Sequence, residues 1–140
     1  LLYLGEKSGK LLGRSAGEKH QITQWLMFQM GGVGPMFGQL GFFHKFGGSE
    51  IEDPRPRERY INEAKRLLTV IEGQLADKEW IAGEYSIADI AIAPWLNILD
   101  FYGARDVVGW ADHPRAVAYL ERFMNRPAVQ RGMNIPPREG

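Results

Sequence analysis

The stretch that most constrains this fold is residues 83–96, where a helix-start signal leads directly into an apolar helix. Ser86 and Asp89 have the spacing of a capping box, in which a hydroxyl and an acidic side chain each accept a backbone N–H at the helix start. Asp89 also favours the positive end of the helix dipole. Residues 90–96 have no polar face over two turns, which predicts a helix buried on all sides. We therefore expect a helical domain around this central helix, with Ser86 and Asp89 in a structural role.

Helix signals recur along the rest of the chain. Ser15 and Glu18 form a second capping box. The helix that they open is interrupted by the glycine- and proline-rich residues 30–35, where we expect a kink before helix resumes through Phe43. Close helix packing and a ligand pocket both remain possible reasons for these glycines. Residues 53–75 have apolar positions three and four apart and predict an amphipathic helix of about six turns. No stretch alternates with period two, so the sequence predicts an all-α fold.

The sequence predicts three parts: a short N-terminal segment, a helical domain and a C-terminal tail. Residues 1–10 begin with an apolar cluster that is typical of the middle of a buried helix, and the chain has no initiator Met. We expect these residues to end a helix that starts earlier in a longer protein. Residues 15–133 form the helical domain, with Asp112 expected to start one of its last helices. Residues 134–140 are a proline-rich tail.

Composition excludes several classes of function. Seventeen basic residues balance seventeen acidic ones, so the net charge favours neither nucleic acid nor an anionic membrane. Cysteine is absent, which removes disulfides, thiolate metal sites and a cysteine nucleophile, and favours a cytoplasmic protein. The three histidines lie far apart, so we expect no metal site. No nucleophile or tuned acid–base pair is apparent, and we expect no catalytic residue in this chain.

Two polar residues are candidates for binding a small molecule. Gln29 immediately precedes the glycine-rich interruption, where a helix is open to a ligand. Arg59 lies in the first turns of the following long helix, and its guanidinium can bind a carboxylate through two hydrogen bonds. A surface salt bridge is the alternative for Arg59.

Several motifs resemble those of a known family. Residues 83–91, GEYSIADIA, resemble the capping-box segment of the helical C-terminal domain of cytosolic glutathione transferases, and residues 126–129, RPAV, resemble its ending. A narrower similarity is to the bacterial nu class and its fungal nitrogen-regulator relatives. Its motifs are QWLMFQMGGVGPM at residues 24–36, ERY at residues 58–60 and EAKRLL at residues 63–68.

The resemblance implies a fold and a set of site residues. Residues 1–10 would be the remnant of the last helix of an N-terminal thioredoxin-like domain, which would hold most of the glutathione site. Gln29 and Arg59 would be the polar contacts that the helical domain makes with glutathione. Phe28, Met36 and Tyr60 would line the cavity for the second substrate.

The resemblance also implies an activity. The parent protein would be a cytoplasmic homodimeric transferase that conjugates glutathione or reduces disulfides with it, and glutathione would be a substrate beside a small disulfide or electrophile. These 140 residues alone would be inactive. The alternative is a non-catalytic interaction or regulatory module of the same fold.

Overall fold

The computed structural model describes residues 1–136, and its regular secondary structure in that range is helical apart from one isolated bridge between Trp80 and Gly83. This architecture confirms the all-α prediction. The elements in chain order are α1 (Leu2–Ser8), α2 (Ala16–Phe28), η1 (Gln29–Val33), α3 (Gly34–His44), η2 (Gly47–Glu50), α4 (Arg55–Gln74), α5 (Ile87–Tyr102), η3 (Trp110–Asp112), α6 (Pro114–Met124) and α7 (Pro127–Gly132). Of the expected tail at 134–140, residues 137–140 lie outside the described range.

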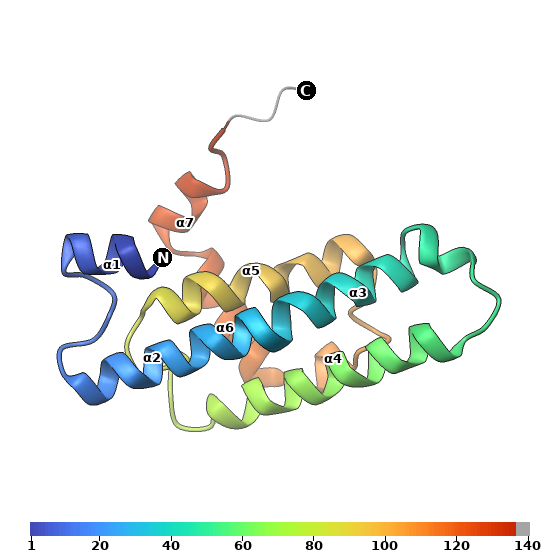
Figure 1. The fold of residues 1–140 in the computed structure, drawn as a ribbon, viewed down its shortest axis with the longest axis horizontal. Helices are drawn as coiled ribbons and strands as arrows, with labels where there is room; N and C mark the ends of the chain where they lie inside the picture. The colour runs from blue at the N-terminus through green and yellow to red at the C-terminus, as the bar shows by residue number, and fades with distance from the viewer. Residues whose placement is uncertain (137–140) are drawn as a thin grey trace.

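One long helical rod, α2–η1–α3, runs through the front of the bundle (Figure 1). It begins at the second capping box, where Ser15 Oγ accepts the Glu18 N–H at 3.2 Å and Glu18 Oε2 accepts the Ser15 N–H at 3.1 Å. At Gln29–Val33 the rod widens into one turn of π-helix before α3 continues to His44. The glycine-rich interruption is therefore a local change of helical pitch, and the helix resumes beyond it as predicted.

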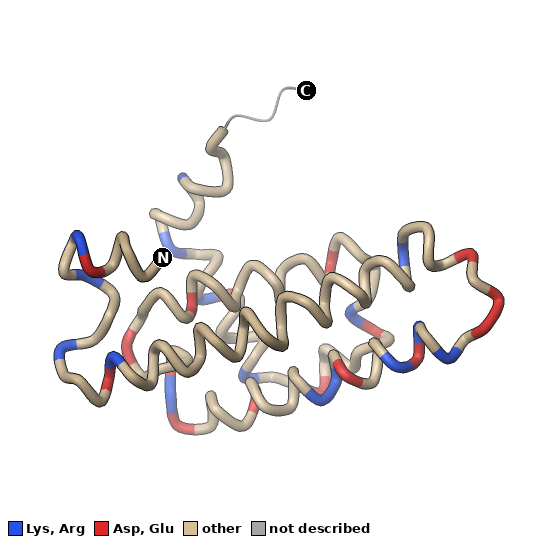
Figure 2. The backbone as a smooth tube through the Cα atoms, in the orientation of Figure 1, with Lys and Arg blue, Asp and Glu red and all other residues tan. Residues whose placement is uncertain are grey.

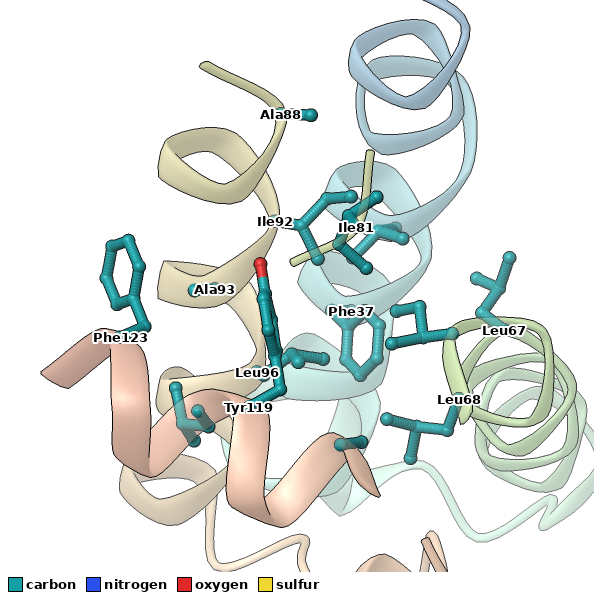
Figure 3. Close-up of a cluster of buried hydrophobic side chains, with 14 of the residues drawn as sticks. Phe37, Leu67, Leu68, Ile81, Ala88, Ile92, Ala93, Leu96, Tyr119 and Phe123 are labelled. Atoms are coloured by element: carbon teal, nitrogen blue, oxygen red, sulfur yellow. The ribbon is translucent and has the colours of Figure 1, made fainter. Parts of the chain in front are cut away.

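The core lies where α3, α4, α5 and α6 meet (Figure 3). Phe37 of α3 and Leu96 of α5 are fully buried in this cluster. Leu67 and Leu68 enter it from α4, because their positions fall on the apolar face of that amphipathic helix. Tyr119 of α6 is also fully buried, and burial together with the nearby Asp89 carboxylate raises the pKa of its hydroxyl.

The start of α5 is held by a buried carboxylate. Asp89 Oδ2 accepts the Ser86 N–H at 2.8 Å, and Ser86 Oγ accepts the Ala88 N–H at 3.2 Å. The other oxygen, Asp89 Oδ1, accepts the Ile81 N–H at 3.0 Å, which ties the loop before the helix to the same side chain. Burial raises the pKa of Asp89 although these hydrogen bonds oppose the shift. Asp89 thus closes the helix start and anchors a second segment that its spacing from Ser86 did not indicate.

The prediction that α5 is buried on all sides is wrong for one face. Ile92, Leu96 and Leu99 are fully buried, but Pro94 and Phe101 are exposed. The physical reason is coverage, since α2, α3 and α6 pack around only part of the circumference of α5.

The short first helix also differs from expectation. Residues 1–4 are apolar, yet Tyr3 is 69% exposed and Leu4 61% exposed. Only Gly5 of α1 is buried, because the Leu12 side chain packs closely against it. Whether residues 1–10 belong to a preceding domain stays a prediction.

Asp112 was expected to start α6, but the side chain that caps this helix comes from another helix. Glu72 of α4 accepts the backbone N–H of Ala116 at 2.9 Å and that of Arg115 at 3.2 Å. His113, at the N-cap position, makes no side-chain capping bond. A carboxylate on a neighbouring helix therefore satisfies N–H groups that a local cap normally takes.

None of the helices from α1 to α7 combines the length and the apolar character that a membrane-spanning helix needs.

Gly41 marks a close helix approach that we expect to be intolerant of a side chain. A Cβ there would lie 2.4 Å from Cζ of Tyr102, and the buried Tyr102 ring has little room to move. We predict that Gly41→Ala lowers the free energy of unfolding by about 1 to 3 kcal/mol. Gly38→Ala, in the same helix with open space around it, should raise that energy by up to about 1 kcal/mol. Urea unfolding of both variants measures the difference, and equal effects would contradict the packing argument.

Asp89 gives a second stability prediction. Asp89→Ala leaves the buried N–H groups of Ile81 and Ser86 without an acceptor, so we expect a loss of about 2 to 4 kcal/mol in the free energy of unfolding. Asp100→Ala is the control on the same helix, because Asp100 is exposed and meets Arg105 only at 3.5 Å; its cost should stay below about 0.5 kcal/mol. Chemical denaturation compares the two, and similar losses would show that Asp89 is not the anchor of α5.

Candidate functional site

A groove between α3 and α4 gathers three of the residues singled out from the sequence. Its volume is about 720 Å³, within the range of about 300 to 1,000 Å³ that is common for small-molecule pockets. Its lining consists of Met36, Arg59, Tyr60, Asn62, Glu63 and Arg66. Met36 comes from α3 and the other five from α4, so the groove depends on how these two helices pack.

Aromatic packing fixes one wall of this groove. The Tyr60 ring stacks on Phe43 with centroids 5.2 Å apart and planes 15° apart. Phe43 in turn meets Phe42 edge to face at 5.0 Å. Tyr60 and Met36 are both half-buried, so they offer apolar surface to a ligand while remaining attached to the core.

Charged side chains form the other part of the groove. Arg66 donates from Nε and Nη2 to the two oxygens of Glu63, at 2.9 Å and 2.8 Å. These hydrogen bonds and the charge of Arg66, with a further contribution from Arg59, hold the pKa of Glu63 below its usual value. The groove therefore carries two guanidinium groups and one ionised carboxylate. Figure 2 shows how acidic and basic positions alternate along this half of α4.

Arg59 is the unpaired charge of the groove. None of the ion pairs within residues 1–136 involves its guanidinium. The surface salt bridge considered from the sequence is therefore absent from the described part of the chain. An exposed arginine with no acidic partner, beside apolar side chains, suits a ligand that carries a carboxylate.

The structure places Gln29 and Phe28 outside this groove. Gln29 begins the π-helical turn, and its Nε2 lies against Gly34 beside the ring of Trp95. Phe28 packs edge to face on Trp25 at 5.1 Å and lines a different groove, between α2 and α4. Phe28 and Met36 thus both line grooves against α4, but Phe28 lies beside the C-terminal half of that helix and Met36 beside its N-terminal half.

The acidic member of the capping box, Asp89, is not accessible to a ligand. Asp89 is fully buried, and its two oxygens accept hydrogen bonds from Ile81 and Ser86. This geometry supports a structural role and leaves no free oxygen directed toward solvent.

The histidines and acidic residues form no metal site within the described range. His113 is buried, with Nδ1 at 2.8 Å from the Gly109 carbonyl oxygen. His44 lies 3.3 Å from the Gly103 carbonyl oxygen at the opposite end of α3 from the π-helical turn. Both contacts hold connections between helices.

Glu63 and Arg66 were not singled out from the sequence, although their spacing from Arg59 gave a signal. Arg59, Glu63 and Arg66 are spaced at i, i+4 and i+7, which places them on one face of a helix. Arg59 was singled out by itself, and its spacing to Glu63 and Arg66 was not used. The proximity of Met36 depends on tertiary packing and was not available from α4 alone.

Comparison with known proteins identifies the fold family. Residues 54–122 match the family model described as Glutathione S-transferase, C-terminal domain. This match contains α4, α5 and most of α6, and therefore all the groove residues on α4.

Individual relatives agree with the family match. The chain is 40% identical over 130 residues to disulfide-bond oxidoreductase YfcG of Escherichia coli, covering 92% of this chain and 58% of that protein. A glutathione transferase structure from Pseudomonas putida, with one glutathione disulfide bound per subunit, is 56% identical with a TM-score of 0.95, covering 97% of this chain and 60% of its own. A glutathione transferase structure from Burkholderia graminis, with two glutathione molecules bound per subunit, is 53% identical with a TM-score of 0.96. The match covers 99% of this chain and 59% of that one. The chain thus spans little more than half the length of these relatives.

Proposed function

The chain carries the helical C-terminal domain of the glutathione transferases, and we propose that the full-length protein binds glutathione in the α3–α4 groove and supports glutathione-dependent disulfide reduction or conjugation. The observation that carries this proposal is the unpaired guanidinium of Arg59, which lies in one groove with Met36 and Tyr60. Glutathione has a carboxylate at each end and a thiol between them, so it needs both cationic and apolar contacts.

The proposed residues have separate tasks. Arg59 binds a carboxylate of glutathione through charge-assisted hydrogen bonds. Met36 and Tyr60 contact the apolar part of the bound molecule or of the second substrate. Gln29, beside Trp95, and Phe28, in the groove between α2 and α4, would contact a ligand outside the α3–α4 groove. Relatives that hold two glutathione molecules or one glutathione disulfide per subunit support more than one binding position.

The proposed chemistry is thiol–disulfide exchange. The glutathione thiolate attacks one sulfur of a substrate disulfide, forms a mixed disulfide and releases the other sulfur as a thiolate. This chain supplies no cysteine, and in the proposed reaction glutathione is the nucleophile. We assign thiol activation to an N-terminal thioredoxin-like domain, and the homodimer and cytoplasmic location stay predictions. The alternative is a non-catalytic module, which would lack productive glutathione binding.

Arg59 provides the direct test of this proposal. In the full-length protein, Arg59→Ala should weaken glutathione binding at least tenfold, because a hydrogen bond between charged groups contributes about 1.5 to 3 kcal/mol. Titration calorimetry with glutathione measures the change. Arg57→Ala is the matched control, since Arg57 is exposed on the same helix and is not part of the groove. Unchanged affinity in the Arg59 variant, or an equal loss in the control, would refute the assignment.

A further inference from the structure

We propose that Leu11 clamps α1 to the start of α5 through its backbone, and that this clamp makes Leu11 a positioning residue for the proposed reaction. The functional part rests on the proposed function, in which α1 ends the thioredoxin-like domain that activates the thiol. The inference is carried by two observations: the left-handed backbone of Leu11, and the hydrogen bond from the Ile87 N–H to its carbonyl oxygen.

The backbone of Leu11 has a conformation that leucine rarely adopts. Its φ is 66°, and within residues 1–136 it is the one residue other than glycine with a positive φ. Left-handed backbone is unfavourable for any residue with a Cβ. Such outliers persist where the surrounding structure imposes them, and they cluster at functional positions. The linker between α1 and α2 is therefore held in place at this residue by its surroundings.

The hydrogen bond of Leu11 completes the cap of α5. The first N–H groups of a helix have no partner within that helix. Ser86 Oγ accepts the Ala88 N–H at 3.2 Å, whereas the Ile87 N–H donates to the Leu11 carbonyl oxygen at 3.1 Å. Ile87 is 2% exposed, so its N–H would be left unpaired and buried without Leu11.

Side-chain packing around Leu11 is too sparse to impose its conformation. A cavity of about 630 Å³ lies beside the linker, between Leu11 and residues 82–86, and the Leu11 side chain is exposed. The ion pair across this cavity, Arg14 with Glu84 at 3.1 Å, joins two strongly exposed side chains, and such pairs contribute little to stability. The hydrogen bond with Ile87 is therefore the contact that fixes the linker against α5.

The fixed linker in turn orients α1. Most of α1 is exposed, and in Figure 1 it lies beside the bundle at the end of this linker. Leu12 packs so closely on Gly5 that a Cβ there would lie 2.7 Å from Cγ of Leu12, and Leu2 packs against the core. A shift of the backbone at Leu11 would therefore turn α1 relative to α5, together with the domain that α1 is proposed to end.

Two substitutions at Leu11 separate its backbone from its side chain. In the full-length protein, Leu11→Val keeps an apolar side chain but disfavours the left-handed backbone, so the Ile87 amide hydrogen should exchange about tenfold faster or more. Leu11→Gly removes the whole side chain but allows that backbone, so exchange should stay at or below the wild-type rate. Hydrogen exchange followed by NMR measures both. Faster exchange in Leu11→Gly than in Leu11→Val would show that side-chain packing holds the linker, and the inference would fail.

Two substitutions at Ile87 test the donor and its effect on the reaction. Ile87→Pro removes the N–H at the first helical position, where proline otherwise fits, and Ile87→Ala keeps the N–H although it leaves the larger cavity. In the reduction of bis(2-hydroxyethyl) disulfide by glutathione, Ile87→Pro and Leu11→Val should each lower kcat and raise the KM for glutathione about threefold or more, because a displaced domain affects binding and chemistry together. Ile87→Ala and Leu11→Gly should stay within about twofold of wild type. Loss of folded protein alone would lower kcat and leave KM unchanged.

The outcomes separate the clamp, its positioning role and the function on which that role rests. If wild type is active and both Leu11→Val and Ile87→Pro keep its kcat and KM, Leu11 is not a positioning residue. If Ile87→Ala impairs the reaction as much as Ile87→Pro, the buried side chain is responsible instead of the N–H, and the inference fails. If wild type reduces no disulfide with glutathione, the proposed function fails and the positioning role fails with it, whereas hydrogen exchange in the Leu11 variants still decides whether the clamp exists.

Discussion

The buried carboxylate of Asp89 is the constraint on which the rest of this bundle depends. It accepts N–H groups from Ser86 at the helix start and from Ile81 in the preceding loop, so two segments are positioned by one side chain. An unsatisfied buried N–H costs about 1 to 3 kcal/mol, and both Asp89 and Ser86 are buried. The exact start of α5 sets the heights at which Ile92 and Leu96 enter the core. The start of α5 therefore also sets where α2, α3 and α6 contact it.

A series of packing contacts connects α5 to the groove between α3 and α4. Tyr102, in the last turn of α5, fits against Gly41 of α3 so closely that no side chain is accommodated there. Phe43, two residues along α3, stacks on Tyr60 and thereby connects α3 to the first half of α4. The two groove arginines, Arg59 and Arg66, are exposed and contribute little to stability, whereas Met36 and Tyr60 are half-buried. Their relative positions are therefore maintained by buried contacts, and their chemistry remains free for binding.

Local patterns predicted the helices and their starts well, because capping boxes and apolar spacing are encoded within a few residues. The boxes at Ser15 and Ser86 are examples. Contacts between distant helices were not accessible in this way. The position of Glu72 within α4 gives no local sign of a capping role, yet it caps α6 from 43 residues away in the chain. Likewise, Arg59 was identified through a motif, whereas its grouping with Met36 needed the packing of α3 on α4. Gln29 belongs to another motif of the same resemblance, residues 24–36, and its side chain lies against Gly34 and Trp95, outside the groove.

Helix α4 shows how one amphipathic element can serve two purposes. Its apolar face buries Leu67, Leu68 and Ile71 in the core, which makes its backbone a rigid support. The opposite face is free of packing constraints, so charge can be arranged there at helical spacing. An arginine that pairs with a glutamate on its own helix, as Arg66 does with Glu63, gains little stability because both groups are partly solvated. The effect of such a pair is on orientation, since two hydrogen bonds to Glu63 fix the guanidinium of Arg66.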